Sequence, residues 1–151
     1  MKELEGLGIE TLVLDVTDAE AVRKVRDEIA TRVGGKLDIL VNNAAYPFAV
    51  TDMSMDAVRS LFEVNIFGPM VMVQEFVHLL IASGHGCIVN IGSVSGILPI
   101  PFSAAYNASK AAIHALGNTL RVELAPFKYV VIYLLLRSFG IADTFYSVSR
   151  Y

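Results

Sequence analysis

The sequence predicts an α/β fold built around a parallel sheet. Short apolar runs alternate with longer segments in which apolar residues recur at helical spacing. Such alternation favours parallel strands joined by right-handed helical crossovers. The chain is 54% hydrophobic and 18% charged, which is typical of strands that helices bury on both faces. Its 151 residues suit one domain, or most of one.

The first expected strand covers residues 11–16, and the helix after it has signals at both ends. Thr17 or Asp18 can cap that helix, because a side-chain oxygen there accepts hydrogen bonds from backbone amides that have no other partner. We expect the helix to run to about Val33 and to end at the glycine pair 34–35, since glycine readily takes the left-handed backbone that closes a helix.

A second strand is expected over residues 37–41 and runs into Asn42-Asn43-Ala44-Ala45. After a loop, Ser54 opens a long helical region with apolar residues at helical spacing. Glycines 84 and 86 end it.

The third strand is expected over residues 87–91, followed by the turn Gly92-Ser93-Val94-Ser95-Gly96. A helix over residues 103–124 and a fourth strand over residues 130–136 complete the pattern. Beyond residue 136 the sequence pattern is hard to interpret.

Charge and cysteine content exclude several classes of protein. The net charge of −3 and pI near 5.5 leave no basic stripe for phosphates, so we expect no nucleic acid partner. Cys87 is the one cysteine, which rules out an internal disulfide and favours a reducing, cytoplasmic location. The three histidines lack metal-ligand spacing, so no metal site is expected.

No segment reaches the roughly 18 apolar residues that span a bilayer. The best candidate, residues 66–81, contains Pro69, Glu75 and His78. Peripheral contact with a membrane stays open.

Polar residues follow several of the expected strands. Asp15, Asn42, Asn43 and Ser93 all lie at or just after carboxyl ends. Ligands of open parallel sheets gather at that edge. The sequence therefore predicts a ligand site there.

Tyr106 and Lys110 are four residues apart in an expected helix, so they share one face. A free phenol has a pKa of about 10, too high for efficient proton exchange near neutrality. A cation about 4 Å away favours the phenolate by roughly 4 kcal/mol at an effective dielectric of about 20. The pair is suited to acid–base chemistry, although a solvent-facing pair without a role has the same spacing.

Ser93 and Asn65 strengthen the acid–base interpretation. A hydroxyl at Ser93 could share a carbonyl oxygen with Tyr106, or it could bond only to its own turn. Asn65 is a side-chain amide in an otherwise apolar helical stretch. It could hold a water or a backbone group, or it could tie the helix to a strand.

The chain resembles the short-chain dehydrogenases/reductases over nearly its whole length. Motifs of that family match in order: Asp15-Val16, Asn42-Asn43-Ala44-Ala45, Asn65, Gly92-Ser93-Val94-Ser95-Gly96, and Tyr106 with Lys110. Four stretches are most similar to the subgroup of fungal NADPH-dependent 1-acyldihydroxyacetone phosphate reductases: residues 65–68, 89–94, 106–112 and 120–127. The fold implied is a Rossmann-like, doubly wound parallel sheet in a single partial NAD(P)-binding domain, residues 1–151.

The resemblance also implies roles for the four residues. Tyr106 would be the general acid that protonates a carbonyl oxygen, with Lys110 making it more acidic and bonding the nicotinamide ribose. Ser93 would position the substrate oxygen, and Asn65 would hold a water of a proton relay.

The cofactor implied is NADPH. Asp15 and Val16 would contact its adenine, and Asn42, Asn43 and Ala44 would line its path, with Tyr106 and Lys110 at the nicotinamide end. The implied partner is a small carbonyl substrate. By resemblance we also expect homo-oligomers and, as an option, association with the endoplasmic reticulum or lipid droplets.

Two departures from the family pattern lead us to expect a truncated chain. The glycine-rich turn that holds the pyrophosphate is absent, as are the family's first two strands. The strand over residues 11–16 would then lack a neighbour, the strand over residues 37–41 would become an apolar edge, and at most three strands would pair. Near the other end, Ser138-Phe139-Gly140 replaces the family's Pro-Gly closure.

The leading hypothesis is an NADPH-dependent carbonyl reductase with a Tyr-Lys-Ser-Asn mechanism. The alternative is an inactive remnant that associates with a full-length relative through its two long helices, residues 54–83 and 103–124.

Overall fold

The computed structural model describes residues 6–44, 53–127, 130–136 and 145–147. Ala45 of the Asn-Asn-Ala-Ala run and the Ser138-Phe139-Gly140 segment lie outside the described residues.

The sheet has four strands in the order β1-β2-β3-β4. β1 (Ile39–Asn42), β2 (Cys87–Ser93) and β3 (Val130–Leu136) are mutually parallel. β4 (Phe145–Ser147) runs antiparallel to β3, with Leu134 opposite Tyr146. The prediction of at most three paired strands was therefore wrong, because a strand of three residues is too short to show periodicity in the sequence.

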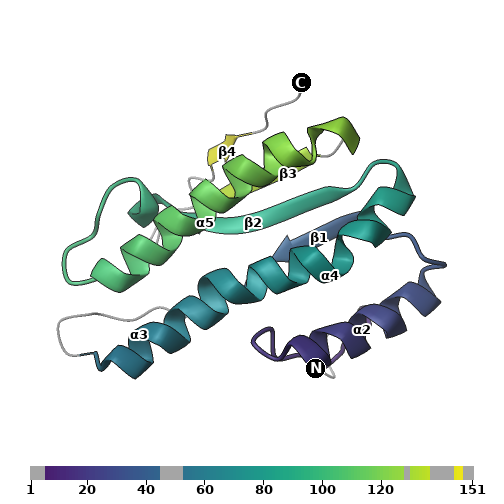
Figure 1. The fold of residues 1–151 in the computed structure, drawn as a ribbon, viewed down its shortest axis with the longest axis horizontal. Helices are drawn as coiled ribbons and strands as arrows, with labels where there is room; N and C mark the ends of the chain where they lie inside the picture. Colours follow the sequence, from purple (N-terminus) through teal and green to yellow (C-terminus); the bar gives the residue numbers. More distant parts are fainter. Residues whose placement is uncertain (1–5, 45–52, 128–129, 137–144, 148–151) are drawn as a thin grey trace.

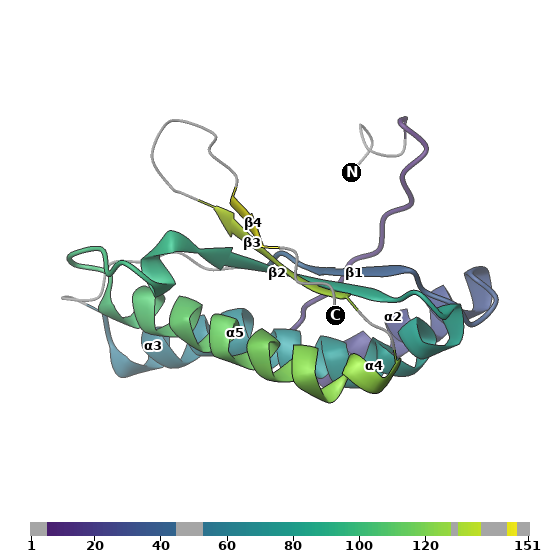
Figure 2. The same ribbon diagram turned by 90° about the horizontal axis from the view of Figure 1, so that it is seen from above.

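The helices lie on one face of this sheet (Figure 2). In β1, Leu40 and Asn42 are buried, whereas Ile39 and Val41 are 57% and 53% exposed. The expected cover on both faces is thus not seen in the described part of the chain. The expected apolar edge is confirmed, because β1 is the first strand in the order.

Residues 11–16 do not form the expected strand. They are described without regular secondary structure, although Leu14 packs against the core. A strand needs a neighbour to accept and donate its backbone hydrogen bonds, and none lies beside these residues in the described sheet. The apolar pattern indicates correctly that part of this segment packs against the core. It does not by itself give a strand, because a strand also needs a neighbour to pair with.

The helix α2 (Ala19–Arg32) begins and ends as predicted. The Asp18 carboxylate accepts hydrogen bonds from Glu20 N at 2.9 Å and Ala21 N at 3.1 Å. Gly34 and Gly35 follow its end with φ of 63° and 76°, a left-handed backbone that costs glycine little.

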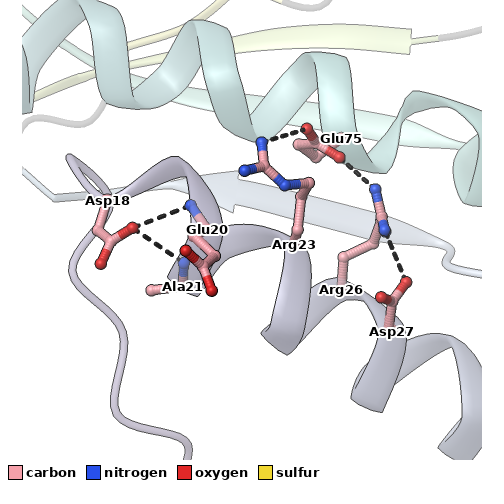
Figure 3. A network of polar contacts seen from close by, with 7 residues as sticks. All are labelled: Asp18, Glu20, Ala21, Arg23, Arg26, Asp27 and Glu75. Carbon is pink, nitrogen blue, oxygen red and sulfur yellow. Dashed lines mark hydrogen bonds and ion pairs between the residues drawn. The ribbon is translucent and has the colours of Figure 1, made fainter.

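Ion pairs fasten α2 to α4 (Gly68–Ser83), as Figure 3 shows. Glu75 of α4 pairs with Arg26 and, at 3.7 Å, with Arg23. The Glu75 and Arg26 side chains are only 20% and 21% exposed, so this contact is screened by water less than a surface pair is. In Figure 1, α2 lies beside α4, on the side away from α5.

The long helical region opens at Ser54 as predicted, but it is not one regular helix. Ser54 caps α3 (Met55–Phe62), and Gly84 closes α4 with φ of 78°. Between them lies a π-helical turn, η1 (Glu63–Phe67). Such turns insert one residue into a helix and are frequent at functional sites. Asn65 lies in this turn.

By length and composition alone, the stretch Met55–Ser83 could cross a membrane, which the sequence analysis did not expect. It has 29 residues and contains an 18-residue window with a mean hydropathy of 1.5. A core helix of a soluble protein passes the same test, and Phe76, Leu79 and Leu80 of this stretch are buried in the core.

The core lies between the sheet and its helices. Phe76 and Leu80 of α4 pack with Val22 of α2, Ile88 of β2 and Val131 of β3, and all five are 3% exposed or less. A second long helix, α5 (Ala104–Glu123), lies along β2 and β3. Between β2 and α5 lies a short 3-10 turn, η2 (Val94–Gly96). Another, η3 (Ala125–Phe127), follows α5.

Candidate functional site

The first turns of α5 carry Tyr106 and Lys110 on one face, as predicted. Lys110 Nζ lies 5.7 Å from the centre of the Tyr106 ring, within the range of a cation–π contact. Lys110 is 3% exposed. Lys110 therefore does not face solvent, and the catalytic role of the pair stays a prediction.

The surroundings of Lys110 disfavour its charge. Its Nζ donates a hydrogen bond to the carbonyl oxygen of Ile91 in β2, at 2.9 Å. Burial lowers the pKa of Lys110 from 10.5 to about 8. At neutral pH the group is still mostly protonated, and its charge acts across a medium of low dielectric constant, where it is stronger than in water.

Ser93 is the last residue of β2, whereas the sequence analysis placed it in the turn that follows the strand. It is 4% exposed and caps the 3-10 turn η2. Its Oγ accepts hydrogen bonds from Ser95 N at 3.2 Å and Ser95 Oγ at 2.9 Å. The hydroxyl thus does bond to its own turn.

The Ser93 turn packs directly on α5. A Cβ on Gly96 would lie 2.6 Å from the carbonyl carbon of Lys110 and 2.8 Å from Ala111 N. Only a residue without a side chain allows this approach. Farther along α5, His114 Nε2 accepts a long hydrogen bond from Ser93 N, at 3.4 Å. The close approach of Gly96 and the hydrogen bond to His114 thus hold the end of β2 against α5, the helix that carries Tyr106 and Lys110.

Asn65 connects the π-helical turn to α5. It is 3% exposed, and its Nδ2 donates to Ser109 Oγ at 3.0 Å. Ser109 Oγ in turn donates to the backbone oxygen of Tyr106 at 2.8 Å. This bond joins η1 to helix α5, so it does not confirm the interpretation of an amide that ties the helix to a strand. A role for Asn65 in holding a water stays a prediction.

Four of the seven residues predicted to contact the cofactor, namely Val16, Asn42, Asn43 and Ala44, meet in one hollow, whereas Tyr106 and Lys110 are not among its lining residues. Its volume is about 190 Å³. The lining residues come from the segment before α2, the end of β1 and the start of α4: Leu14, Val16, Val41, Asn42, Asn43, Ala44, Pro69 and Met72.

Asp15 is not among the lining residues. Its carboxylate accepts hydrogen bonds from Thr17 N at 2.9 Å and Thr17 Oγ1 at 2.7 Å. These bonds hold the pKa of Asp15 below its usual value. The structure therefore shows Asp15 stabilising the turn before α2, and its contact with adenine stays a prediction.

Asn42 also has a structural bond. Its Nδ2 donates to Asn90 Oδ1 at 2.9 Å, across the paired strands β1 and β2. Asn90 is fully buried, and its Nδ2 has no hydrogen-bond partner among the described residues. A buried donor without a partner is costly, so this amide pair is a place where a bound group or water could stabilise the sheet end.

The hollow is better suited to a flat ring of a dinucleotide than to its phosphates. Apolar walls with a few amide groups are typical of sites for flat organic ligands. A pyrophosphate is usually held by the amides of a glycine-rich turn at a helix N-terminus. None of the helices in the described residues opens on such a turn, and Gly8, at φ of 77°, lies in an exposed turn with no helix directly after it.

Four residues of the site were missed as functional candidates: Ser95, Gly96, Ser109 and His114. Ser109 had a visible signal, since it is a small polar residue three positions after Tyr106, on the same helix face. For His114 the signal was its position one turn after Lys110. Burial, and then the charge of Lys110, lower the pKa of His114.

Comparison with known proteins agrees with this architecture. The family model described as short chain dehydrogenase matches residues 1–145. The chain is 46% identical over 131 residues to the short-chain dehydrogenase virD of Hypocrea virens. It is 44% identical over 129 residues to the NADPH-dependent 1-acyldihydroxyacetone phosphate reductase of Schizosaccharomyces pombe. These matches cover 85% and 84% of this chain, but only 45% and 43% of those proteins.

Solved structures give the same result. A xylitol dehydrogenase bound to NAD+ has a TM-score of 0.83 at 33% identity, over 93% of this chain and 56% of that one. A gluconate 5-dehydrogenase of Burkholderia cenocepacia, in complex with NADP and tartrate, has a TM-score of 0.83 at 31% identity, with the same coverage. The chain thus spans about half the length of the proteins that it matches.

Proposed function

Because the chain belongs to the short-chain dehydrogenases, we propose that it carries the catalytic part of an NADPH-dependent carbonyl reductase. The observation that supports this most is the buried Lys110, whose Nζ lies 5.7 Å from the Tyr106 ring. A cation is costly in such a place, and a proton-transfer role for the neighbouring phenol gives a reason for it.

In this proposal the chain's own residues handle the proton and the substrate oxygen. Tyr106 donates its phenolic proton to the carbonyl oxygen as that oxygen gains negative charge. Lys110 favours the phenolate that remains. Ser93 donates a hydrogen bond to the same oxygen, which stabilises the developing charge.

Asn65 acts from behind the site. Through Ser109 it fixes the backbone of Tyr106, at 3.0 Å and 2.8 Å for the two hydrogen bonds. A fixed backbone keeps the phenol in the orientation that proton transfer needs.

NADPH supplies the hydride in such reactions. Val16, Asn42, Asn43 and Ala44 would line its path, and Lys110 would bond its ribose. The named relative and the solved structures with bound NADP support this cofactor. The substrate we propose is a ketone, with 1-acyldihydroxyacetone phosphate as one candidate from the S. pombe relative.

The test needs two forms of the protein. We expect the chain alone to bind NADPH weakly, since its described helices offer no glycine-rich turn to the pyrophosphate. Titration followed by NADPH fluorescence measures this, and micromolar affinity would contradict the expectation. A fusion that adds the preceding segment of the S. pombe reductase should oxidise NADPH when a ketone is added.

The fusion also tests the roles. Tyr106→Phe should lower ketone-dependent NADPH oxidation by about 100-fold or more, the usual contribution of a positioned acid. Full activity in Tyr106→Phe would show that the proposed mechanism is wrong, whereas an inactive fusion that binds NADPH would count against the reductase assignment itself.

A second candidate is a non-catalytic role in association with a full-length relative. The exposed apolar residues Ile39 and Val41 on the free edge of β1 favour it, because such edges invite pairing. A pull-down with a full-length relative tests this, and absence of binding would count against it. The long helices α4 and α5 are a further contact surface in this candidate.

A further inference from the structure

We propose that Ser95 is a positioning residue that fixes the Ser93 hydroxyl as a hydrogen-bond donor toward the substrate oxygen; this rests on the proposed function. Ser95 lies in η2, two residues after Ser93. It is 1% exposed, so it acts through Ser93.

Counting donors and acceptors shows what Ser93 has left to offer. A serine hydroxyl has one proton and two acceptor lone pairs. Ser95 N and Ser95 Oγ both donate to Ser93 Oγ, at 3.2 Å and 2.9 Å. Both acceptor positions are then occupied. The proton of Ser93 is the one part of the group that remains available to a ligand.

The surroundings favour one direction for the bond between the two hydroxyls. Either direction leaves one proton without an acceptor among the described residues: the Ser95 proton if Ser93 donates, and the Ser93 proton if Ser95 donates. An unpaired buried hydroxyl is costly. A ligand can relieve that cost at Ser93, which ends β2, where ligands of parallel sheets bind, whereas Ser95 is 1% exposed.

The consequence is a hydroxyl prepared for an acceptor. A carbonyl oxygen is an acceptor whose negative charge grows during reduction, so a donor already oriented toward it needs no reorganisation. Without Ser95 Oγ, the Ser93 hydroxyl could rotate and use its proton elsewhere. Loss of Ser95 should therefore weaken the reaction step more than it weakens cofactor binding.

A thermal unfolding cycle on the purified chain tests the pair without any activity. Ser95→Ala should lower the Tm of the unchanged chain. In a Ser93→Ala background the same substitution should leave the Tm equal or raise it, because it then removes a buried hydroxyl that has lost its acceptor. Equal Tm losses in both backgrounds would overturn the proposed bond.

Kinetics on the fusion test the positioning. Ser95→Ala should lower kcat about tenfold while the KM for NADPH stays the same. Ser95→Thr keeps the hydroxyl and should restore most of kcat. In the Ser93→Ala background, Ser95→Ala should have no further effect. Ser103→Ala, a serine whose side chain does not cap α5, is the matched control and should behave as the unchanged fusion.

The outcomes separate the two claims. A fusion that binds NADPH but is inactive counts against the proposed function, and the unfolding cycle then decides alone whether Ser95 holds Ser93. An active fusion with unchanged kcat in Ser95→Ala rejects the positioning role and leaves the reductase assignment standing. Equal loss of kcat from Ser95→Ala in both backgrounds would show a purely structural effect and also reject it.

Discussion

Replacing Lys110 by methionine should make the protein more stable at neutral pH. Methionine has a similar length and no charge, so it removes the cost of keeping an ammonium group in a site that is 3% exposed. The fall in pKa from 10.5 to about 8 corresponds to about 3 kcal/mol, at about 1.4 kcal/mol per unit. The lost hydrogen bond to Ile91 O offsets about 1 kcal/mol of this.

The net gain of about 2 kcal/mol should appear as a rise in Tm of about 4–8 °C for a chain of this size. Calorimetry or circular dichroism at about pH 7 measures it. Lys24→Met is the control, because Lys24 forms an exposed pair with Glu20 on α2 and its loss should change stability by less than about 0.5 kcal/mol.

The pH dependence of stability distinguishes the removal of a buried charge in Lys110→Met from a change in side-chain packing. Between about pH 8 and pH 10.5 the unfolded chain holds a proton on Lys110 that the folded chain has released, so the free energy of unfolding rises with pH through this window. The unchanged chain should gain up to about 3 kcal/mol there relative to Lys110→Met. A destabilised Lys110→Met, or parallel pH profiles for the two proteins, would refute the reasoning.

Three further results are expected. Gly96→Ala should cost about 1–3 kcal/mol of unfolding free energy by urea titration, since its Cβ would meet the Lys110 backbone at 2.6 Å. A loss of less than about 0.5 kcal/mol, the size of an ordinary surface substitution, would contradict this close approach. The pKa of His114 is lowered in the folded chain. Below about pH 6.5 the unfolded chain therefore binds a proton at this residue more readily than the folded chain does, so the free energy of unfolding falls as the pH falls. Between about pH 7 and pH 5, His114→Gln should lose less stability than the unchanged chain. Glu75→Gln should cost about 1 kcal/mol by removing the partner of Arg26, and no change in Tm would show that the pair contributes nothing.

Local chemistry made much of the fold predictable. The caps of α2 are short-range signals, and Asp18 and Gly34 lie where the sequence placed them. The strands β2 and β3 were found because each is composed mostly of apolar residues. Residues 11–16 have the same kind of pattern, yet they form no strand in the described chain, because pairing depends on a distant segment and not on the run itself.

The candidate site was predictable in its members and not in its connections. The Tyr106–Lys110 spacing fixed their common face, since helix geometry is local. The π-helical turn around Asn65 and the approach of Gly96 to Lys110 depend on contacts between elements far apart in the chain. Such contacts have no periodic signature in a single sequence, which is why Ser95 and Gly96 were missed.

The most direct measurement is a crystal structure of the fusion with NADPH and a bound ketone or ketone-like inhibitor. The account predicts that the Tyr106 phenol and the Ser93 hydroxyl both lie within about 3.2 Å of the same ligand oxygen, with Lys110 Nζ behind the phenol. A ligand oxygen bonded to neither group, or two side chains that face separate pockets, would contradict it.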